Sequence, residues 1–384
     1  MRIALIAPEK LPVPPISGGP VEITIYELAR RLQDRHQVTV FCPSDPSLPE
    51  HESLMNMRYL RLPHPSTDQY LEALMQQFTT ETFELVHIFD RPQFVLSLAP
   101  RLVDTKFILH LHSDLPFKES SGAEAVACLD QVSAVVVTSH FLRIHVATRF
   151  PRLYDKSRVI KPGVDLTRFA PVWGAMEERT RKRQQLHLAD KQIIMCASSL
   201  ASVEGIHILL QALRPLMRQD QARLLMLVGD SWYSDPSATP YSRDLAQYGQ
   251  GFKKQIFFTG SLKVSEMPMV YQLADLYVCP AQWEEHQGMV NLEVMATGLP
   301  VIASARGAIP EMVRHGQTGI LVYKHTEPAG FTKAIEFLLA NPKLAADLGR
   351  QGRGLVEREY QWEQAVEELE QLQDEVMAEK PFAV

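Results

Sequence analysis

Two glutamates, Glu285 and Glu293, frame Gly288 in the stretch AQWEEHQGMVNLEVMATGLP. A glycine allows the backbone to turn tightly, and the apolar residues after it predict a helix that begins near Met289. The free N–H groups of Met289 and Val290 would then lie at the start of that helix. A carboxylate accepts hydrogen bonds from hydroxyls such as those of sugars and riboses. Acids also favour helix starts without any ligand, so this stretch alone leaves both interpretations open.

A second candidate is the pair Gly18 and Gly19 in PPISGGPVEITIYELA, between a predicted first strand and the helix after it. Two glycines permit a close backbone approach, and a helix N-terminus offers free N–H groups to an anion. The pattern is not GxGxxG, and the acid that dinucleotide binding needs after the next strand is missing. A flexible turn explains the same residues.

Histidines end two of the predicted strands. FILHLHSD alternates, so His110 and His112 point to the same side, and His112 ends its strand, where ligands bind in α/β folds. His87 ends another strand in LVHIFDRP. A metal pair is one interpretation of these residues, but no third ligand is close in the sequence. Structural histidines are the alternative.

The composition indicates an ordered protein with a large core. The chain has 384 residues, of which 46% are hydrophobic and 22% charged, and this length suggests two or three domains. A formal net charge of -6 argues against a nucleic-acid partner. We expect a cytoplasmic protein, since no signal peptide pattern and no run of about 18 apolar residues occurs. Free thiols are expected because no CxxC spacing links the four cysteines, Cys42, Cys128, Cys196 and Cys279.

Apolar runs of strand length alternate with helical patterns in both halves of the chain. The first half contains RIALIAP, HQVTVFC, LVHIF, FILHLH, SAVVVTS and SRVIKPG, and the second contains QIIMCASS, ARLLMLVGD, QIFFTG, LADLYVCP, LPVIAS and GILVY. Continuous apolar strands between helices are typical of parallel sheets covered on both faces. We therefore predict two doubly wound, Rossmann-like domains facing a central cleft, with a hinge at residues 171–190. Residues 362–377 predict a long amphipathic helix.

The order of these motifs resembles that of the retaining glycosyltransferases of the GT-B fold, and more narrowly family 4 with its E-x7-E signature. The resemblance covers nearly the whole chain, and it rests on the acid pair, MATGLPVIAS, GAIPEMVRHGQTGILV, ISGGPVEITIYELARRL, FELVHIFDRP, LHLHSD and KPGVDLTRF. Members associated with bacterial spore coats look most similar. The segment YQW resembles the one that crosses back to the first domain. The resemblance thus implies a first, acceptor-side domain of residues 1–170 plus 362–384 and a donor-side domain of residues 191–361.

The resemblance also implies the roles of the candidate residues. Glu285 would hold hydroxyls of the donor sugar, His112 would lie against the transferred sugar, and both would be catalytic. Glu293 would hold the ribose of a nucleotide diphosphate sugar. The remaining donor-binding positions would be Gly18, Gly19, Ser199, Glu204, Phe258, Gly260, Gly288, Met289 and Val290. No metal or other cofactor is expected, because cations and helix N-termini neutralise the leaving diphosphate in this fold.

One segment departs from the family pattern. Members carry an Arg and a Lys in G-R-L-x-x-x-K-G, and both hold the diphosphate, whereas this chain reads ASSLASVEG with Ser199 and Glu204 at those positions. Two missing charge-assisted hydrogen bonds and a repelling carboxylate together cost roughly 6 to 9 kcal/mol. This cost shrinks if Lys161, Lys263 or Arg306 supplies a substitute charge, or if Glu204 rotates outward.

This departure leaves two main hypotheses. The first is an active glycosyltransferase acting on an unknown acceptor, such as a cell-envelope or spore-surface glycan. The second is a catalytically degenerate GT-B protein kept as a binding or coat component. A sugar-nucleotide epimerase of the same fold fits the motif order less well. The basic stretch from Arg143 to Arg168 is compatible with peripheral contact to an acidic membrane surface or with an ordinary solvated surface.

Overall fold

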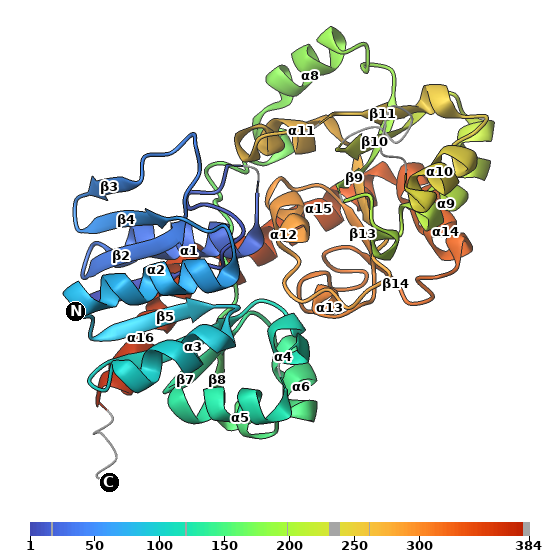
Figure 1. The fold of residues 1–384 in the computed structure, drawn as a ribbon. Coiled ribbons are helices and arrows are strands. Elements are labelled where there is room, and N and C mark those ends of the chain that lie inside the picture. Colours follow the sequence, from blue (N-terminus) through green and yellow to red (C-terminus); the bar gives the residue numbers. More distant parts are fainter. Residues whose placement is uncertain (17, 120, 198, 230–238, 261, 379–384) are drawn as a thin grey trace. The chain divides into compact units, whose positions relative to one another are not determined.

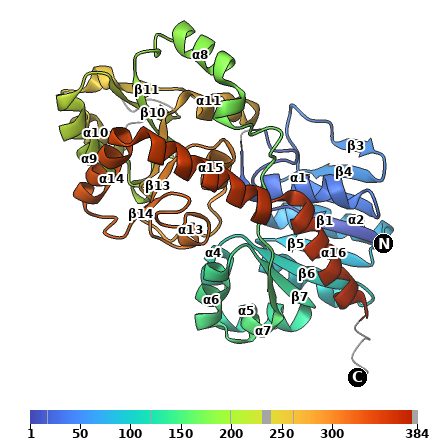
Figure 2. The same ribbon diagram turned by 180° about the vertical axis from the view of Figure 1, so that it is seen from behind.

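The computed structural model describes residues 1–384 apart from residues 17, 120, 198, 230–238, 261 and 379–384. The chain forms two compact units, one of Met1–Gly163 with Trp362–Val384 and one of Val164–Gln361. Each unit has its own sheet with helices on both faces (Figures 1 and 2). The predicted α/β fold with two doubly wound parallel sheets is confirmed. Among the described residues, no helix has the length and apolar character needed to cross a bilayer.

The sheet of the first unit has eight strands in the order β3-β4-β2-β1-β5-β6-β7-β8. Its strands are β1 (Arg2–Ile6), β2 (Gln37–Pro43), β3 (His51–Leu54), β4 (Met57–Leu62), β5 (Leu85–Phe89), β6 (Lys106–Leu111), β7 (Ala134–Val137) and β8 (Ser157–Val159). All neighbours pair in parallel except β3 with β4. The six predicted strands form, while the β3–β4 hairpin was not predicted, because an exposed edge strand such as HESL lacks an apolar run.

Helices cover both faces of this sheet. They are α1 (Pro20–Leu32), α2 (Thr67–Thr80), α3 (Pro92–Leu98), α4 (Leu115–Glu119), α5 (Gly122–Gln131), α6 (His140–Arg149), α7 (Arg152–Lys156) and α16 (Trp362–Ala378), with the 3-10 turn η1 (Ala99–Arg101). The predicted C-terminal helix is α16, and its apolar face is buried as expected from the spacing. It packs beside α1, where Arg35 pairs with Glu370 at 2.8 Å (Figure 2).

The sheet of the second unit has six parallel strands in the order β11-β10-β9-β12-β13-β14. They are β9 (Gln192–Ala197), β10 (Arg223–Val228), β11 (Ile256–Phe258), β12 (Leu276–Cys279), β13 (Val301–Ser304) and β14 (Ile320–Val322). All six coincide with predicted apolar runs. Nearly every side chain in β12 and β13 is buried, as continuous apolar strands require.

The helices of the second unit are α8 (Met176–Gln185), α9 (Ile206–Gln219), α10 (Pro240–Tyr248), α11 (Met267–Leu273), α12 (Met289–Ala296), α13 (Ile309–Met312), α14 (Pro328–Ala340) and α15 (Pro342–Glu359). Short 3-10 turns are η2 (Val172–Gly174), η3 (Ser202–Glu204), η4 (Lys253–Gln255) and η5 (Val264–Glu266). The segment that we expected to be a hinge forms η2 and α8. It is tied to the second unit through Asp275, which pairs with Arg179 at 2.6 Å and Arg183 at 2.8 Å.

Candidate functional site

Glu285, which precedes α12, is hydrogen-bonded to three backbone N–H groups. Its Oε1 accepts hydrogen bonds from the backbone N–H groups of His286 at 3.0 Å, Gln287 at 3.2 Å and Gly288 at 3.2 Å. Gly288 is the N-cap of α12 and has φ 67°, a left-handed conformation that glycine adopts without strain. A Cβ there would approach Met312 Cε to 2.8 Å. The predicted helix start at Met289 is confirmed, and the left-handed turn favours glycine, while an added Cβ would require the end of the flexible Met312 side chain to shift.

The second acid of the signature is buried inside α12. Oε2 of Glu293 accepts the hydroxyl hydrogen of Tyr271 at 2.7 Å. Burial raises the pKa of Glu293 to about 7, opposed by the Tyr271 hydrogen bond and by the positive charge of Arg168. The sequence predicted neither of these two neighbours. A tyrosine at helical spacing in MPMVYQL is indistinguishable from an ordinary core residue.

The loop after β13 supports the first acid. The Ala308 N–H donates to the backbone carbonyl of Glu285 at 2.7 Å, and a Cβ on Gly307 would come within 2.0 Å of that same oxygen. Gly307 also donates its N–H to Glu284 Oε2 at 2.6 Å, while Glu284 Oε1 pairs with Arg306 at 2.7 Å. Arg306 was a candidate to replace the missing phosphate-binding charges; its Nη2 pairs with Glu284, while its buried Nε has no hydrogen-bond partner among the described residues.

The two residues that replace the family cations lie together. Ser199 Oγ is 3.5 Å from Glu204 Oε1, at the outer limit of a hydrogen bond. Burial raises the pKa of Glu204, and the negative charge of Glu285 raises it further. Glu204 is followed by Gly205, whose added Cβ would meet the Pro280 carbonyl oxygen at 2.0 Å. The tight turn therefore presents the carboxyl group of Glu204 close enough to Glu285 for the two charges to interact.

The two positions predicted to contact the base lie at the carboxyl end of β11. Phe258 is the last residue of that strand and is half-buried. Gly260 has φ 75° and donates its N–H to the Gly229 carbonyl at 3.0 Å, which joins it to the end of β10. Residues 230–238, which follow Gly229 in the chain, lie outside the described residues.

In the first unit, the glycine loop leads directly into α1. Gly18 and Gly19 have φ values of 109° and 111°, and Gly19 is the N-cap with Pro20 at the first helical position. A Cβ on Gly19 would lie 2.2 Å from Glu22 Oε2, so this acid folds back over the loop. Burial raises the pKa of Glu22 to about 7, with smaller opposing effects from its backbone hydrogen bond and Arg91. We had not predicted an acid at this loop.

The strand-end histidine is buried and held by an aspartate. The backbone N–H of His112 donates to Asp90 Oδ1 at 2.8 Å. Burial lowers the pKa of the His112 ring to about 3, so the ring is neutral near pH 7. His110 instead hydrogen-bonds His87, with 2.8 Å between Nε2 and Nδ1, and His87 Nε2 lies 3.1 Å from Gln373 of α16. These contacts favour the structural interpretation of His87 and His110.

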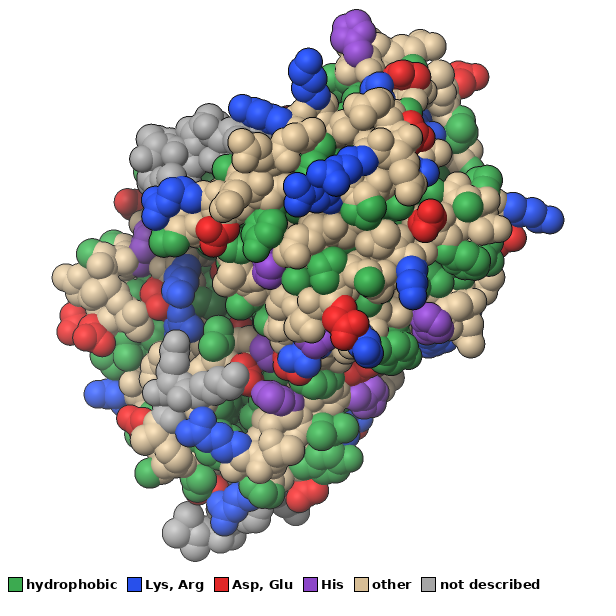
Figure 3. Space-filling model, turned by 90° about the vertical axis from the view of Figure 1, so that its right-hand side faces the viewer, with side chains coloured by type: hydrophobic (Ala, Val, Ile, Leu, Met, Phe, Trp, Pro, Cys, Tyr) green, Lys and Arg blue, Asp and Glu red, His purple; other side chains and the backbone are tan. Residues whose placement is uncertain are grey.

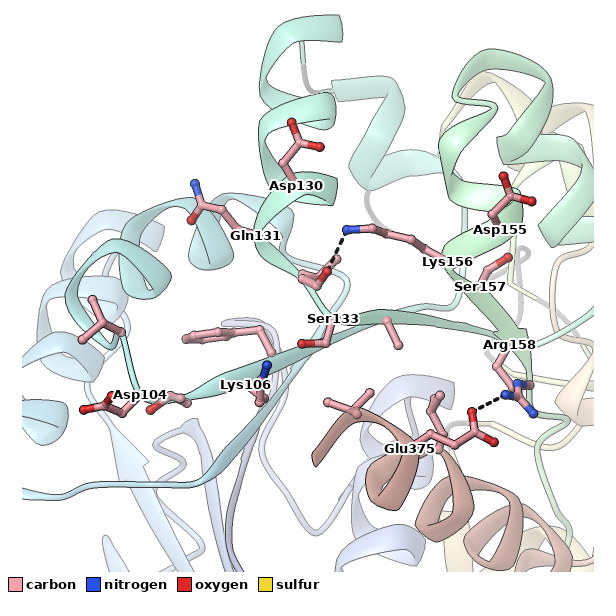
Figure 4. Close-up of a pocket in the computed structure, with 17 residues that line it drawn as sticks. Asp104, Lys106, Asp130, Gln131, Ser133, Asp155, Lys156, Ser157, Arg158 and Glu375 are labelled. Carbon is pink, nitrogen blue, oxygen red and sulfur yellow. Dashed lines mark hydrogen bonds and ion pairs between the residues drawn. The ribbon is translucent and has the colours of Figure 1, made fainter. Parts of the chain in front are cut away.

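A large hollow in the first unit lies away from these residues (Figure 4). It has a volume of about 700 Å³ and lies at the amino ends of β6, β7 and β8, whereas His112 follows the carboxyl end of β6. Two of its cations are engaged: Lys156 Nζ donates to the Val132 carbonyl at 3.0 Å, and Arg158 pairs with Glu375 at 2.6 Å. Ligands of doubly wound sheets bind at the carboxyl ends of strands, so we do not assign this hollow to the reaction.

Solved structures with the same architecture are known. Sucrose-phosphate synthase from Thermosynechococcus elongatus superposes with a TM-score of 0.80 at 25% identity, covering 98% of this chain and 99% of that one. The Anabaena protein HepE, solved in complex with UDP, gives a TM-score of 0.77 at 19% identity, covering 97% and 99%. The fold is therefore GT-B, with the acid–glycine–acid segment after the carboxyl end of β12.

The family follows from the sequence comparisons. The model of glycosyl transferases group 1 matches residues 178–373, and the model of Glycosyltransferase Family 4 matches residues 18–168. Spore coat protein SA of Bacillus subtilis is 33% identical over 96% of this chain and 98% of its own length. The chain belongs to the glycosyl transferases group 1 family and is a glycosyltransferase, which confirms the resemblance found in the sequence.

Proposed function

We propose that the protein is a retaining glycosyltransferase that moves a sugar from a nucleotide diphosphate sugar to an acceptor without a bound metal. The observation that carries the proposal is the arrangement around α12. Glu285 is fixed by three backbone N–H groups before the helix, and Glu293 lies one turn inside it with its hydrogen bond to Tyr271. Two carboxyl groups at one helix start suit a ligand with two sets of hydroxyls, a sugar and a ribose.

The remaining roles follow from position. In this proposal Glu285 and His112 contact the transferred sugar and act in catalysis, and Glu293 binds the ribose. The N–H groups at the start of α12 and the Gly18–Gly19 loop at α1 neutralise the leaving diphosphate, which is why no metal is invoked. Phe258 and Gly260 line the base position. Ser199 and Glu204 stand at the positions where the family pattern has the Arg and Lys that bind the diphosphate.

A thermal-shift screen tests the proposal. UDP, GDP, ADP and their sugars are added at millimolar concentration to the wild-type protein and to Glu293→Ala. A ligand at 100 times its Kd stabilises the folded state by about 2.7 kcal/mol, which corresponds to a rise in Tm of roughly 5 to 10 °C for domains of 150–250 residues. We expect a rise with one base and a smaller rise in Glu293→Ala. If no nucleotide raises Tm, the proposed function is wrong.

A degenerate binding protein is the second candidate, and one observation favours it. The carboxyl group of Glu204 lies near that of Glu285, where the family pattern has a lysine. A diphosphate bound there would meet an acid in place of two cations. The binding protein predicts that sugars or glycans stabilise the fold while nucleotides do not, so the same screen with free hexoses separates the two candidates.

The acceptor in this proposal is a glycan of the cell envelope or spore surface, supported by the relative named spore coat protein SA. Contact with an acidic membrane surface has less support. Several cations of residues 143–168 already have partners, since Arg152 pairs with Asp130 at 2.9 Å and Arg143 donates to the Tyr154 carbonyl at 2.8 Å. On the face shown in Figure 3, Lys and Arg side chains are interspersed with Asp and Glu.

A further inference from the structure

The turn after β5 has an unusual backbone for its residue type. Asp90 connects β5 to the residue before α3 and has φ 51°, a left-handed conformation that aspartate, asparagine and glycine adopt most readily. The residue is only 8% exposed. A buried, non-glycine residue in this conformation is held there by its surroundings, and such positions cluster at functional sites.

The left-handed conformation of Asp90 extends the hydrogen bonding between β5 and β6 beyond their last paired residues. The regular register of these two parallel strands ends at Phe89 opposite His110. Asp90 then donates its own N–H to the His110 carbonyl at 2.9 Å, and its side chain turns to accept the His112 N–H at 2.8 Å. The carboxylate thus supplies the acceptor that a backbone carbonyl would provide in a longer strand.

Phe89 and Asp90, at the same turn, also lie beside the imidazole ring of His112. Phe89 stacks against it with 5.8 Å between centroids and 30° between planes. Oδ2 of Asp90 lies 3.9 Å from His112 Nδ1, beyond hydrogen-bond distance, and Nδ1 has no hydrogen-bond partner among the residues that the structure describes. The backbone and the ring face of His112 are therefore both fixed by residues 89 and 90.

We infer that Asp90 is a positioning residue for His112: its carboxyl group fixes the backbone at the end of β6, so that the imidazole meets the transferred sugar in one orientation. The inference rests on the proposed function, since His112 acts on a sugar only there. A misplacement of about 1 Å in such a group lowers turnover by roughly 100-fold. Asp90 does not itself contact the sugar in this scheme.

The variants Asp90→Gly and Asp90→Asn test the role of Asp90 Oδ1 as a hydrogen-bond acceptor. Both tolerate the left-handed backbone, but only asparagine keeps an oxygen at the Oδ1 position. Hydrogen exchange of the His112 amide and the ring nitrogen shifts of His112 are measured by NMR. We expect exchange at least ~10-fold faster and displaced ring shifts in Asp90→Gly, with both restored in Asp90→Asn. Unchanged exchange and shifts in Asp90→Gly would overturn the inference.

Activity gives an independent readout. Hydrolysis of UDP-glucose, UDP-N-acetylglucosamine and GDP-mannose is followed in wild type, Asp90→Gly, His112→Ala and the double variant. We expect Asp90→Gly to lower kcat by ~10- to 100-fold with donor KM within ~3-fold, and to have no further effect on the His112→Ala background. Effects that multiply in the double variant would contradict positioning through His112. No turnover of any donor by wild type would count against the proposed function, while the NMR result still decides the inference.

Discussion

Restoring the family cations tests where the diphosphate binds. The double variant Ser199→Arg with Glu204→Lys replaces a half-buried acid next to Glu285 by a cation and adds a guanidinium at the neighbouring position. Each charge-assisted hydrogen bond contributes ~1.5–3 kcal/mol. Removing a carboxylate ~5 Å from a phosphate relieves about 3 kcal/mol at an effective dielectric of ~20. Arginine and lysine must order their side chains on binding, and burial raises the pKa of Glu204 and so lowers the charge that is removed. We therefore expect about half of each contribution, roughly 3 to 4.5 kcal/mol in total, or an affinity gain of at least ~100-fold.

The assay is isothermal titration calorimetry with UDP and GDP at pH 7.5. The neutral variant Ser199→Ala with Glu204→Gln removes the acid without adding a cation, and we expect it to gain only about 10-fold. Glu177→Lys makes the same charge change as Glu204→Lys alone, on the exposed side of α8, and controls for net charge. If the double cation variant binds no more tightly than the neutral variant, the phosphates do not lie beside these residues. The placement of the donor site is then wrong.

Further outcomes follow from the same geometry. Because burial raises the pKa of Glu293 to about 7 from 4.5, the folded state holds its proton more tightly than the unfolded state, so stability falls as pH rises from 4.5 to 7. Glu293→Gln should therefore raise Tm most above pH 7, with the gain shrinking toward pH 4.5 in thermal scans. Gly288→Ala should cost about 1 kcal/mol more in urea unfolding than Gly316→Ala, which is also left-handed but meets no atom within 4 Å, because the end of the Met312 side chain must shift. His112→Ala should lower turnover by at least ~100-fold while calorimetric UDP affinity changes within ~3-fold. UDP affinity should rise from pH 8 to 6.5, because burial raises the pKa of Glu22 to about 7, and Glu22→Gln should flatten this rise.

Periodicity and apolar runs identified nearly all of the sheet strands, because buried parallel strands must be apolar throughout. The β3–β4 hairpin was not predicted because β3 lies at an exposed edge of the sheet, where a strand does not need an apolar run. In the site, the glycine positions were predictable, since a turn with φ 67° at Gly288 leaves few alternatives. The hydrogen-bond partners of the candidate side chains were not predictable. Tyr271 reaches Glu293 across 22 residues, and Asp90 reaches His112 across 22, contacts that sequence spacing does not encode.

The acids at the two glycine loops raise the same physical problem in each unit. In one, the carboxyl group of Glu22 lies against Gly19; in the other, that of Glu204 lies near Glu285. A diphosphate approaching either loop as a free anion would be repelled if these groups were fully ionised. Burial raises the pKa of Glu22 to about 7 and raises that of Glu204 as well, so both are easier to protonate than an exposed glutamate.

Protonation turns a repelling acceptor into an O–H donor that can bind a phosphate oxygen. An approaching anion would raise these pKa values further, so donor binding should be accompanied by proton uptake. The heat of UDP binding should therefore vary with the ionisation enthalpy of the buffer near pH 7, and binding without proton uptake would place the phosphates away from both acids.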